Sequence, residues 1–175
     1  KEVASLFLVI FSVGIAIGSV SINALLKGEV SARYSPISVV IMGAFVVAFY
    51  FVCRLWQSYE ITEIMGVTEF LAWPLASLIM LTLIGIAIAG GMFVVPLYAF
   101  LTTRCAPDQA ARTIAANNIV NSGSMVAGSL VAMALSAIGV PVVEQLLLSA
   151  GMCLVSAWLG HRLHQAELDE GQSPA

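Results

Sequence analysis

Long apolar segments separated by short polar ones make up almost the whole chain. Five of these segments are long enough to cross the roughly 30 Å hydrocarbon core of a bilayer as helices. A soluble helical bundle would need polar faces on most of its helices, and the second and fifth segments have almost no polar side chains. We therefore expect an all-α membrane protein with five transmembrane helices. The predicted spans are residues 3–26, 37–56, 72–101, 113–138 and 142–160.

Composition supports the membrane assignment and narrows the function. The chain is 60% hydrophobic and 10% charged, with a mean hydropathy of +1.00, whereas soluble domains carry about 25% charged residues. The net charge of −3 with scattered basic residues gives no nucleic-acid surface. No nucleophile–base set, metal-ligand cluster or phosphate-binding loop stands out. We therefore expect neither an enzyme nor a bound cofactor or metal.

The positive charges predict an orientation. If the five spans alternate in direction, five of the seven Lys and Arg residues fall on one side and two on the other, a bias that marks the richer side as cytoplasmic. The N-terminus then lies outside and the C-terminus inside. Because the chain begins with Lys1 and has an odd number of spans, we expect a fragment of a longer transporter. The cytoplasmic group is Lys27, Arg33, Arg104, Arg112 and Arg162, and the outer group is Lys1 and Arg54.

The fourth span is the most polar one. Three asparagines, Asn117, Asn118 and Asn121, and the nearby Ser124 lie near its start. At 100° per residue, its polar and small residues cover a face of about 140°, and polar groups at that depth usually face a protein interior or a watery cavity. We expect this face to line a substrate path or a cytoplasmic gate. The alternative is that the asparagines form hydrogen bonds between helices.

In the first span, Ser12, Ser19 and Asn23 share one helix face, which is a second candidate for the path. The opposite face carries Gly14 and Gly18, a spacing that lets helix backbones approach closely. The alternative for the two serines is hydrogen bonding to carbonyl groups of their own helix.

The third span contains Gly90, Gly91 and Pro96. Proline removes one helical hydrogen bond and presses on the preceding turn, so these residues predict a kink or hinge. Such breaks line substrate sites or allow gating in transporters, and the alternative is a static kink that improves packing. The second and fifth spans, which are nearly free of polar side chains, are expected on the outside of the bundle. Residues 164–175 are predicted to form a polar, disordered cytoplasmic tail.

The loop after the first span carries a partial signature. Residues 23–36 read NALLKGEVSARYSP, which resembles the cytoplasmic loop signature G-x-x-S-D-R-x-G-R of the major facilitator superfamily. Gly28, Ser31 and Arg33 match, whereas Ala32 replaces the aspartate that takes part in a charge latch in the family. The resemblance implies that the spans are helices 8–12, which form most of the C-terminal six-helix bundle and work with the N-terminal half of the same transporter.

Two further segments are similar to the bacterial lysophospholipid transporter branch of that superfamily. They are GGMFVVPLYAFL at 90–101 and AARTIAANNIVN at 110–121. The similarity implies movement of a lysophospholipid across the bacterial inner membrane, in functional association with an acyltransferase. No ionisable residue lies in the middle of any span, so coupling to protons would need residues outside this chain. The alternatives are an efflux transporter of a small amphiphilic molecule and a membrane anchor for a partner acyltransferase.

Overall fold

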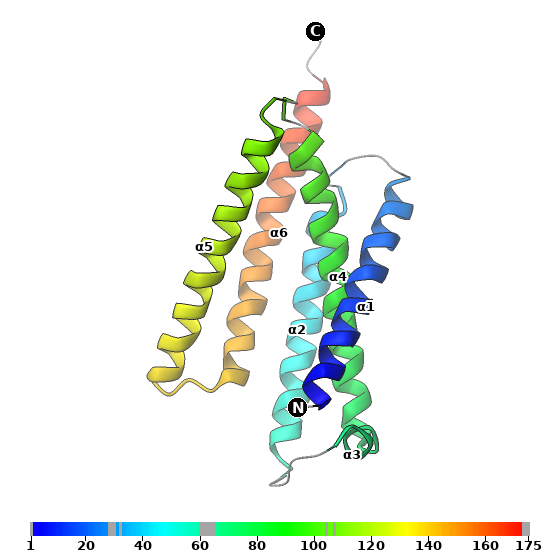
Figure 1. The fold of residues 1–175 in the computed structure, drawn as a ribbon, viewed down its shortest axis with the longest axis vertical. Coiled ribbons are helices and arrows are strands. Elements are labelled where there is room, and N and C mark those ends of the chain that lie inside the picture. Colours follow the sequence, from blue (N-terminus) through cyan, green and yellow to red (C-terminus); the bar gives the residue numbers. More distant parts are fainter. Residues whose placement is uncertain are drawn as a thin grey trace.

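The computed structural model describes residues 2–27, 31, 33–59, 66–103, 105–106 and 108–172 of the 175-residue chain. Of the described residues, 89% are helical and none lies in a strand. The helices are arranged as long, roughly antiparallel rods (Figure 1). They are α1 (Glu2–Leu26), α2 (Ser35–Gln57), α3 (Val67–Leu71), α4 (Pro74–Thr103), α5 (Ala110–Ala137) and α6 (Val142–Gln172).

Five of these helices, all except α3, are long and apolar enough to cross a membrane. The shortest of them, α2, has 23 residues and is therefore about 34 Å long at 1.5 Å per residue, against a hydrocarbon core of about 30 Å. Each helix coincides with a predicted span to within a few residues at its start. The expectation of an all-α fold with five apolar spans is confirmed, and the chain has the architecture of a multi-pass membrane protein.

Two features differ from the sequence-based expectation. The tail expected to be disordered from residue 164 is helical through Gln172, because Gln, Ala, Glu and Leu favour helix and no glycine or proline interrupts residues 161–170. The short helix α3 was not predicted. Its start is capped by the Glu69 carboxylate, which accepts a hydrogen bond from the Gly66 N–H at 3.0 Å.

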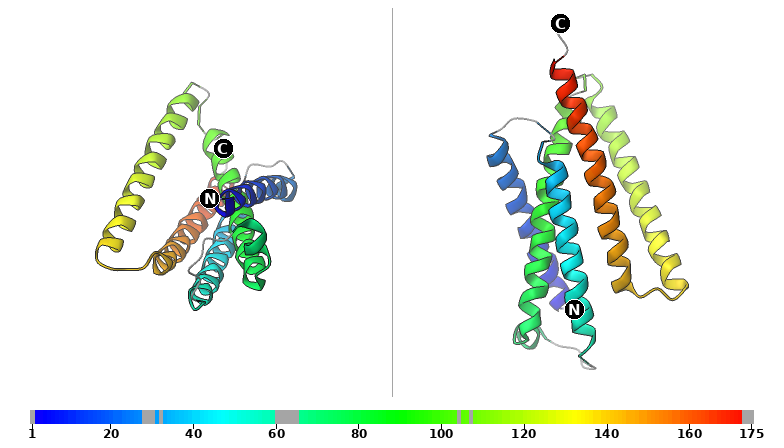
Figure 2. Two further views of the ribbon diagram at one scale, coloured as in Figure 1. Left: turned by 60° about the horizontal axis from the view of Figure 1, so that its bottom comes forward. Right: turned by 180° about the vertical axis from the view of Figure 1, so that it is seen from behind.

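The helices alternate in direction, so their ends form two groups (Figures 1 and 2). The first, which we call the Lys27 end, contains the end of α1, the start of α2, the end of α4 and the start of α5. The second, which we call the Arg54 end, contains the end of α2, the start of α4 and the start of α6. The predicted orientation of the chain in the membrane assumed that successive helices alternate in direction in this way.

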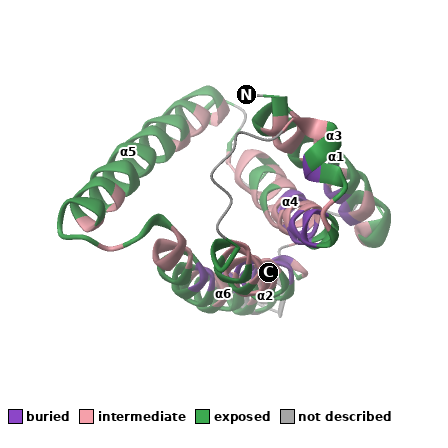
Figure 3. Ribbon diagram, turned by 90° about the horizontal axis from the view of Figure 1, so that it is seen from below, coloured by how far each residue is buried: buried purple, intermediate pink, exposed green. Residues whose placement is uncertain are grey.

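The packing is uneven across the bundle. Helix α4 packs along both α1 and α2, α2 also packs along α6, and α5 meets its neighbours α4 and α6 only sparsely. Seen from below, α5 stands apart and is exposed along most of its length (Figure 3), with no buried residue. The expectation that the second span lies on the outside stays a prediction: α2 keeps an exposed stripe that includes Ile37, Val40 and Phe51, and it packs between α4 and α6. Small residues rather than polar ones allow this contact: a Cβ atom placed at Gly43 would lie 3.0 Å from the Cβ of Cys153.

The contact between α1 and α4 depends on glycines. A Cβ atom at Gly14 would lie 2.5 Å from the Cβ of Ala87, and one at Gly18 would overlap the backbone carbonyl of Ile88. From the other side, a Cβ atom at Gly91 would come within 2.6 Å of a carbonyl oxygen of α1. The predicted close approach of helix backbones at this spacing is therefore confirmed.

An aromatic cluster closes the Arg54 end between α1, α2 and α4. The rings of Trp56 and Trp73 have centroids 5.8 Å apart. Phe70 of α3 lies 5.5 Å from Trp56 and 5.5 Å from Phe7 of α1. The short helix α3 thus contributes the buried centre of this cluster.

Replacing Gly18 by leucine should lower stability, because the added atoms would press on the backbone of α4 rather than on a flexible side chain. Overpacking of this kind costs about 1–3 kcal/mol. Thermal unfolding of the purified full-length protein in detergent measures the effect. Gly151→Leu is the control, since a Cβ atom at Gly151 meets nothing within 4 Å. Equal melting temperatures for the two variants would contradict the role assigned to the α1–α4 contact.

Candidate functional site

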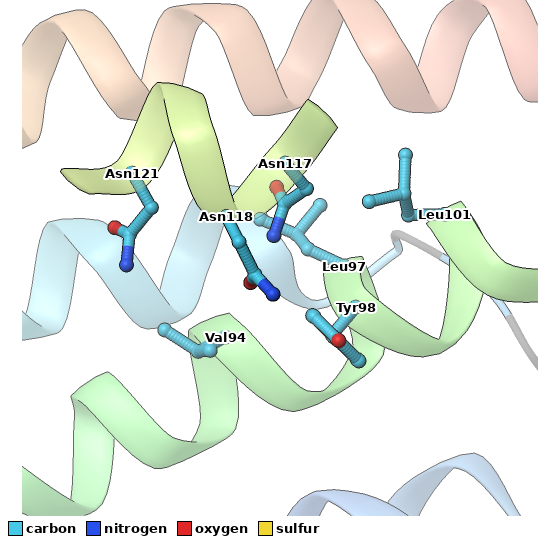
Figure 4. A pocket seen from close by; sticks show the side chains of 7 residues that line it. All are labelled: Val94, Leu97, Tyr98, Leu101, Asn117, Asn118 and Asn121. Carbon is cyan, nitrogen blue, oxygen red and sulfur yellow. The ribbon is translucent and has the colours of Figure 1, made fainter. Parts of the chain in front are cut away.

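The three asparagines of α5 lie close to the Lys27 end. Helix α5 begins at Ala110, so Asn117 and Asn121 lie about 10 and 17 Å along its axis at 1.5 Å per residue. Asn117 is half-buried, whereas Asn118 and Asn121 are exposed. All three side chains extend from α5 toward the last turns of α4 (Figure 4). The structure therefore brings the predicted amides together on the side of α5 that faces α4.

The amides line a cavity of about 450 Å³ between α4 and α5. Its wall on α5 is polar, and its wall on α4 is mostly apolar, with the Tyr98 phenol as the one hydroxyl group. We call this space the amide cavity. Its lining residues are Val94, Leu97, Tyr98, Leu101, Asn117, Asn118 and Asn121 (Figure 4).

The amide cavity offers hydrogen bonds but no charge. None of its seven lining residues is ionised at neutral pH, and each amide supplies two donor hydrogens and an acceptor oxygen. Within the described part of the chain, the three amide groups have no hydrogen-bond partner. An unpaired amide in an apolar environment costs free energy, so the three amide groups are available to water or to another polar partner in the cavity.

The predicted serines are placed differently. The hydroxyl groups of Ser12, Ser19 and Ser124 each donate to a carbonyl oxygen one turn earlier in their own helix, at 2.8 Å in all three cases. This is the alternative considered for the two serines of α1. Asn23 is exposed near the Lys27 end of α1. None of these four residues lines the amide cavity.

The glycines and proline of the predicted hinge lie in one continuous helix, α4. Gly91 has a packing role against α1, and a Cβ atom at Gly90 would be in ordinary contact with Met42, at 3.6 Å from its sulfur. Pro96 is buried and lies between the cavity residues Val94 and Leu97 in the sequence. Gly91 therefore serves helix packing, as the alternative of a static kink proposed. Motion about Pro96 stays a prediction.

The loop signature is only partly described. Gly28 and Ala32 lie outside the described residues. The backbone N–H of Arg33 donates to the hydroxyl of Ser31 at 3.2 Å, and the Arg33 guanidinium carbon lies 5.3 Å from the centre of the Tyr34 ring. Arg33 thus makes a cation–π contact with its neighbour in this structure.

An ion pair at the opposite end was not predicted. The guanidinium of Arg54 donates to one carboxylate oxygen of Glu144 at 2.7 Å, and the Tyr50 hydroxyl donates to the other at 3.1 Å. These contacts join α2 to α6 at the Arg54 end. The sequence places a basic residue and an acidic residue at the outer ends of two spans. It does not reveal that these two spans are neighbours, so the ion pair could not be predicted.

A comparison of the chain with protein-family models, curated proteins and solved structures finds no match. The resemblance to the major facilitator superfamily therefore rests on the residues quoted above. Among the described residues, no group of three or more His, Cys, Asp or Glu side chains is placed to hold a metal ion.

The pair between Arg54 and Glu144 should contribute only modestly to stability, because the two side chains are 56% and 30% exposed. Exposed pairs contribute about 0.2–1 kcal/mol, and high salt screens them. A double-mutant cycle with Arg54→Gln and Glu144→Gln, measured by unfolding at low and high salt, gives the coupling free energy. Strictly additive effects of the two substitutions would show that the contact does not join the helices energetically.

Proposed function

We propose that this chain is part of a secondary transporter that moves a lysophospholipid across the bacterial inner membrane, with its five spans as helices 8–12 of a major facilitator superfamily fold. The observation that carries the proposal is the amide cavity, where three amides without a partner among the described residues face a mostly apolar wall, and none of the described lining residues is charged. A lysophospholipid combines the same two properties, since it has a polar headgroup and a single acyl chain. Asn117, Asn118 and Asn121 would bind the headgroup or hold the inner gate.

The orientation in this proposal follows from the charges. Four described basic residues, Lys27, Arg33, Arg112 and Arg162, lie toward the Lys27 end by the course of their helices. The positive-inside rule makes this the cytoplasmic side, with the C-terminus inside. The amide cavity then opens near the cytoplasmic face. The N-terminal half of the transporter would supply the opposite wall of the path, and an acyltransferase would use the delivered lipid.

An efflux transporter for a small amphiphile would use the same cavity, because an uncharged polar wall suits many amphiphilic molecules. Competition separates the two functions: unlabelled lysophospholipid inhibits the transport of the natural cargo only if it occupies the same site. A membrane anchor for an acyltransferase requires no cavity. It predicts that unrelated spans can replace these helices with lipid turnover intact, and the amide face of α5 gives no support to that reading.

The double substitution Asn117→Ala and Asn121→Ala should reduce uptake of lysophosphatidylethanolamine into spheroplasts by about tenfold. The reason is that each lost hydrogen bond is worth about 0.5–1.5 kcal/mol, and about 1.4 kcal/mol corresponds to a factor of ten. Gln57→Ala is the control, since it removes an exposed amide at the opposite end of the bundle that does not line the cavity. Normal uptake by the double variant, at normal protein levels, would remove the asparagines from the mechanism.

A further inference from the structure

Tyr98 lies on the α4 wall of the amide cavity and has the one hydrogen-bonding side chain among the described residues of that wall. The α4 residues that line the cavity recur at spacings of three and four and therefore share one helix face. They are Val94, Leu97, Tyr98 and Leu101. The buried Pro96 lies about 160° away from Tyr98 around the helix. The Tyr98 ring and the Asn118 amide both extend into the space between α4 and α5 (Figure 4).

The Tyr98 hydroxyl has no hydrogen-bond partner among the described residues. The hydroxyl of Thr102, one turn later, bonds within the helix and donates to the carbonyl oxygens of Tyr98 and Ala99, both at 3.0 Å. A phenol cannot do the same, because its rigid ring holds the hydroxyl away from its own backbone. The hydroxyl of Tyr50, for comparison, bonds to Glu144 on another helix at 3.1 Å. The Tyr98 hydroxyl is therefore available to water or to a ligand of the cavity.

The two walls of the amide cavity present hydrogen-bond donors to the same space. The amides on α5 donate through N–H groups, and the phenol on α4 donates through its O–H group. A phosphate group accepts several such bonds at once, and a hydrogen bond to an ionised acceptor is about twice as strong as one between neutral groups. No Asp or Glu is among the described lining residues, so no carboxylate of this wall repels a phosphate.

We propose that Tyr98 is a specificity-determining residue of the amide cavity, whose hydroxyl donates to the phosphate of the lysophospholipid headgroup from the side opposite the asparagines. This inference rests on the proposed function and adds a contact from a second helix to it. Helices α4 and α5 meet only sparsely, so a phosphate bound by Tyr98 and Asn118 would connect them. A lipid with the same acyl chain but no phosphate, such as a monoacylglycerol, lacks this contact.

Tyr98→Phe tests the proposal, because it removes the hydroxyl and keeps the ring. It should raise the KM for uptake of lysophosphatidylethanolamine into spheroplasts by about tenfold, the effect of one lost hydrogen bond to a charged group. The maximal rate per molecule should not change, because the bond is lost equally from the bound lipid and from the transition state. A lower protein level cannot imitate this result, since KM does not depend on the amount of protein.

Tyr59→Phe is the matched control. Tyr59 is 43% exposed and Tyr98 is 42% exposed, but Tyr59 follows α2 at the Arg54 end and does not line the amide cavity. Its substitution should leave the KM unchanged. An unchanged KM in Tyr98→Phe as well would overturn the proposal.

Competition measures the specificity itself. A monoacylglycerol with the same acyl chain should inhibit uptake with the same inhibition constant in the wild type and in Tyr98→Phe. The preference for the phosphate-bearing lipid should therefore fall by the factor by which the KM rises. Equal weakening of both lipids would show that Tyr98 acts through the shape of the cavity, and would overturn the phosphate assignment.

The asparagine variants separate this inference from the proposed function. Reduced uptake by the Asn117→Ala and Asn121→Ala double variant, together with a normal KM in Tyr98→Phe, would refute the role of Tyr98 and leave the proposed function intact. The combination of Tyr98→Phe with Asn118→Ala tests the shared contact. If both residues bind one phosphate, their effects on the KM are coupled; strictly multiplicative effects would contradict the proposal.

Discussion

The hydrocarbon core of a bilayer contains no water to pair with polar groups, and this constraint organises the whole structure. Backbone groups satisfy it by forming helices, each long enough to cross the core. Hydroxyl groups such as Ser12 and Ser124 satisfy it by bonding to carbonyl groups of their own helices. The three asparagine amides of α5 have no partner among the described residues. Like the buried Ser35 hydroxyl, they therefore need a hydrogen-bond partner from outside the described contacts.

Packing explains why these amides remain accessible. Glycines allow α1 to lie directly against α4, and small residues let α2 pack against α6. Helix α5 has no such close contact and no buried residue. The amide cavity and a larger, mostly apolar cavity bounded by α2, α5 and α6 therefore remain beside α5.

The number of spans and the approximate start of each were predictable because they depend on local hydrophobicity, whereas the end of α6 at Gln172 was not. The Gly14–Gly18 contact was also predictable, since its spacing has a direct geometric meaning. The sequence does not reveal which helices are neighbours. The ion pair between Arg54 and Glu144 and the position of α2 between α4 and α6 depend on tertiary packing, which no local sequence pattern records. For the site, the sequence indicated the three asparagines, while the apolar wall that completes their cavity, on α4, emerged only from the fold.

The proposed function requires that the amide face of α5 lines a path that water can enter, and thiol labelling tests this directly. In a full-length protein whose Cys53, Cys105 and Cys153 have been replaced, the single substitutions Asn121→Cys and Ile119→Cys place a thiol on the side of α5 that lines the amide cavity and on its opposite side. A small, water-soluble maleimide should label the first rapidly in native membranes and the second hardly at all. Equal labelling of both, or protection of Asn121→Cys, would contradict the account.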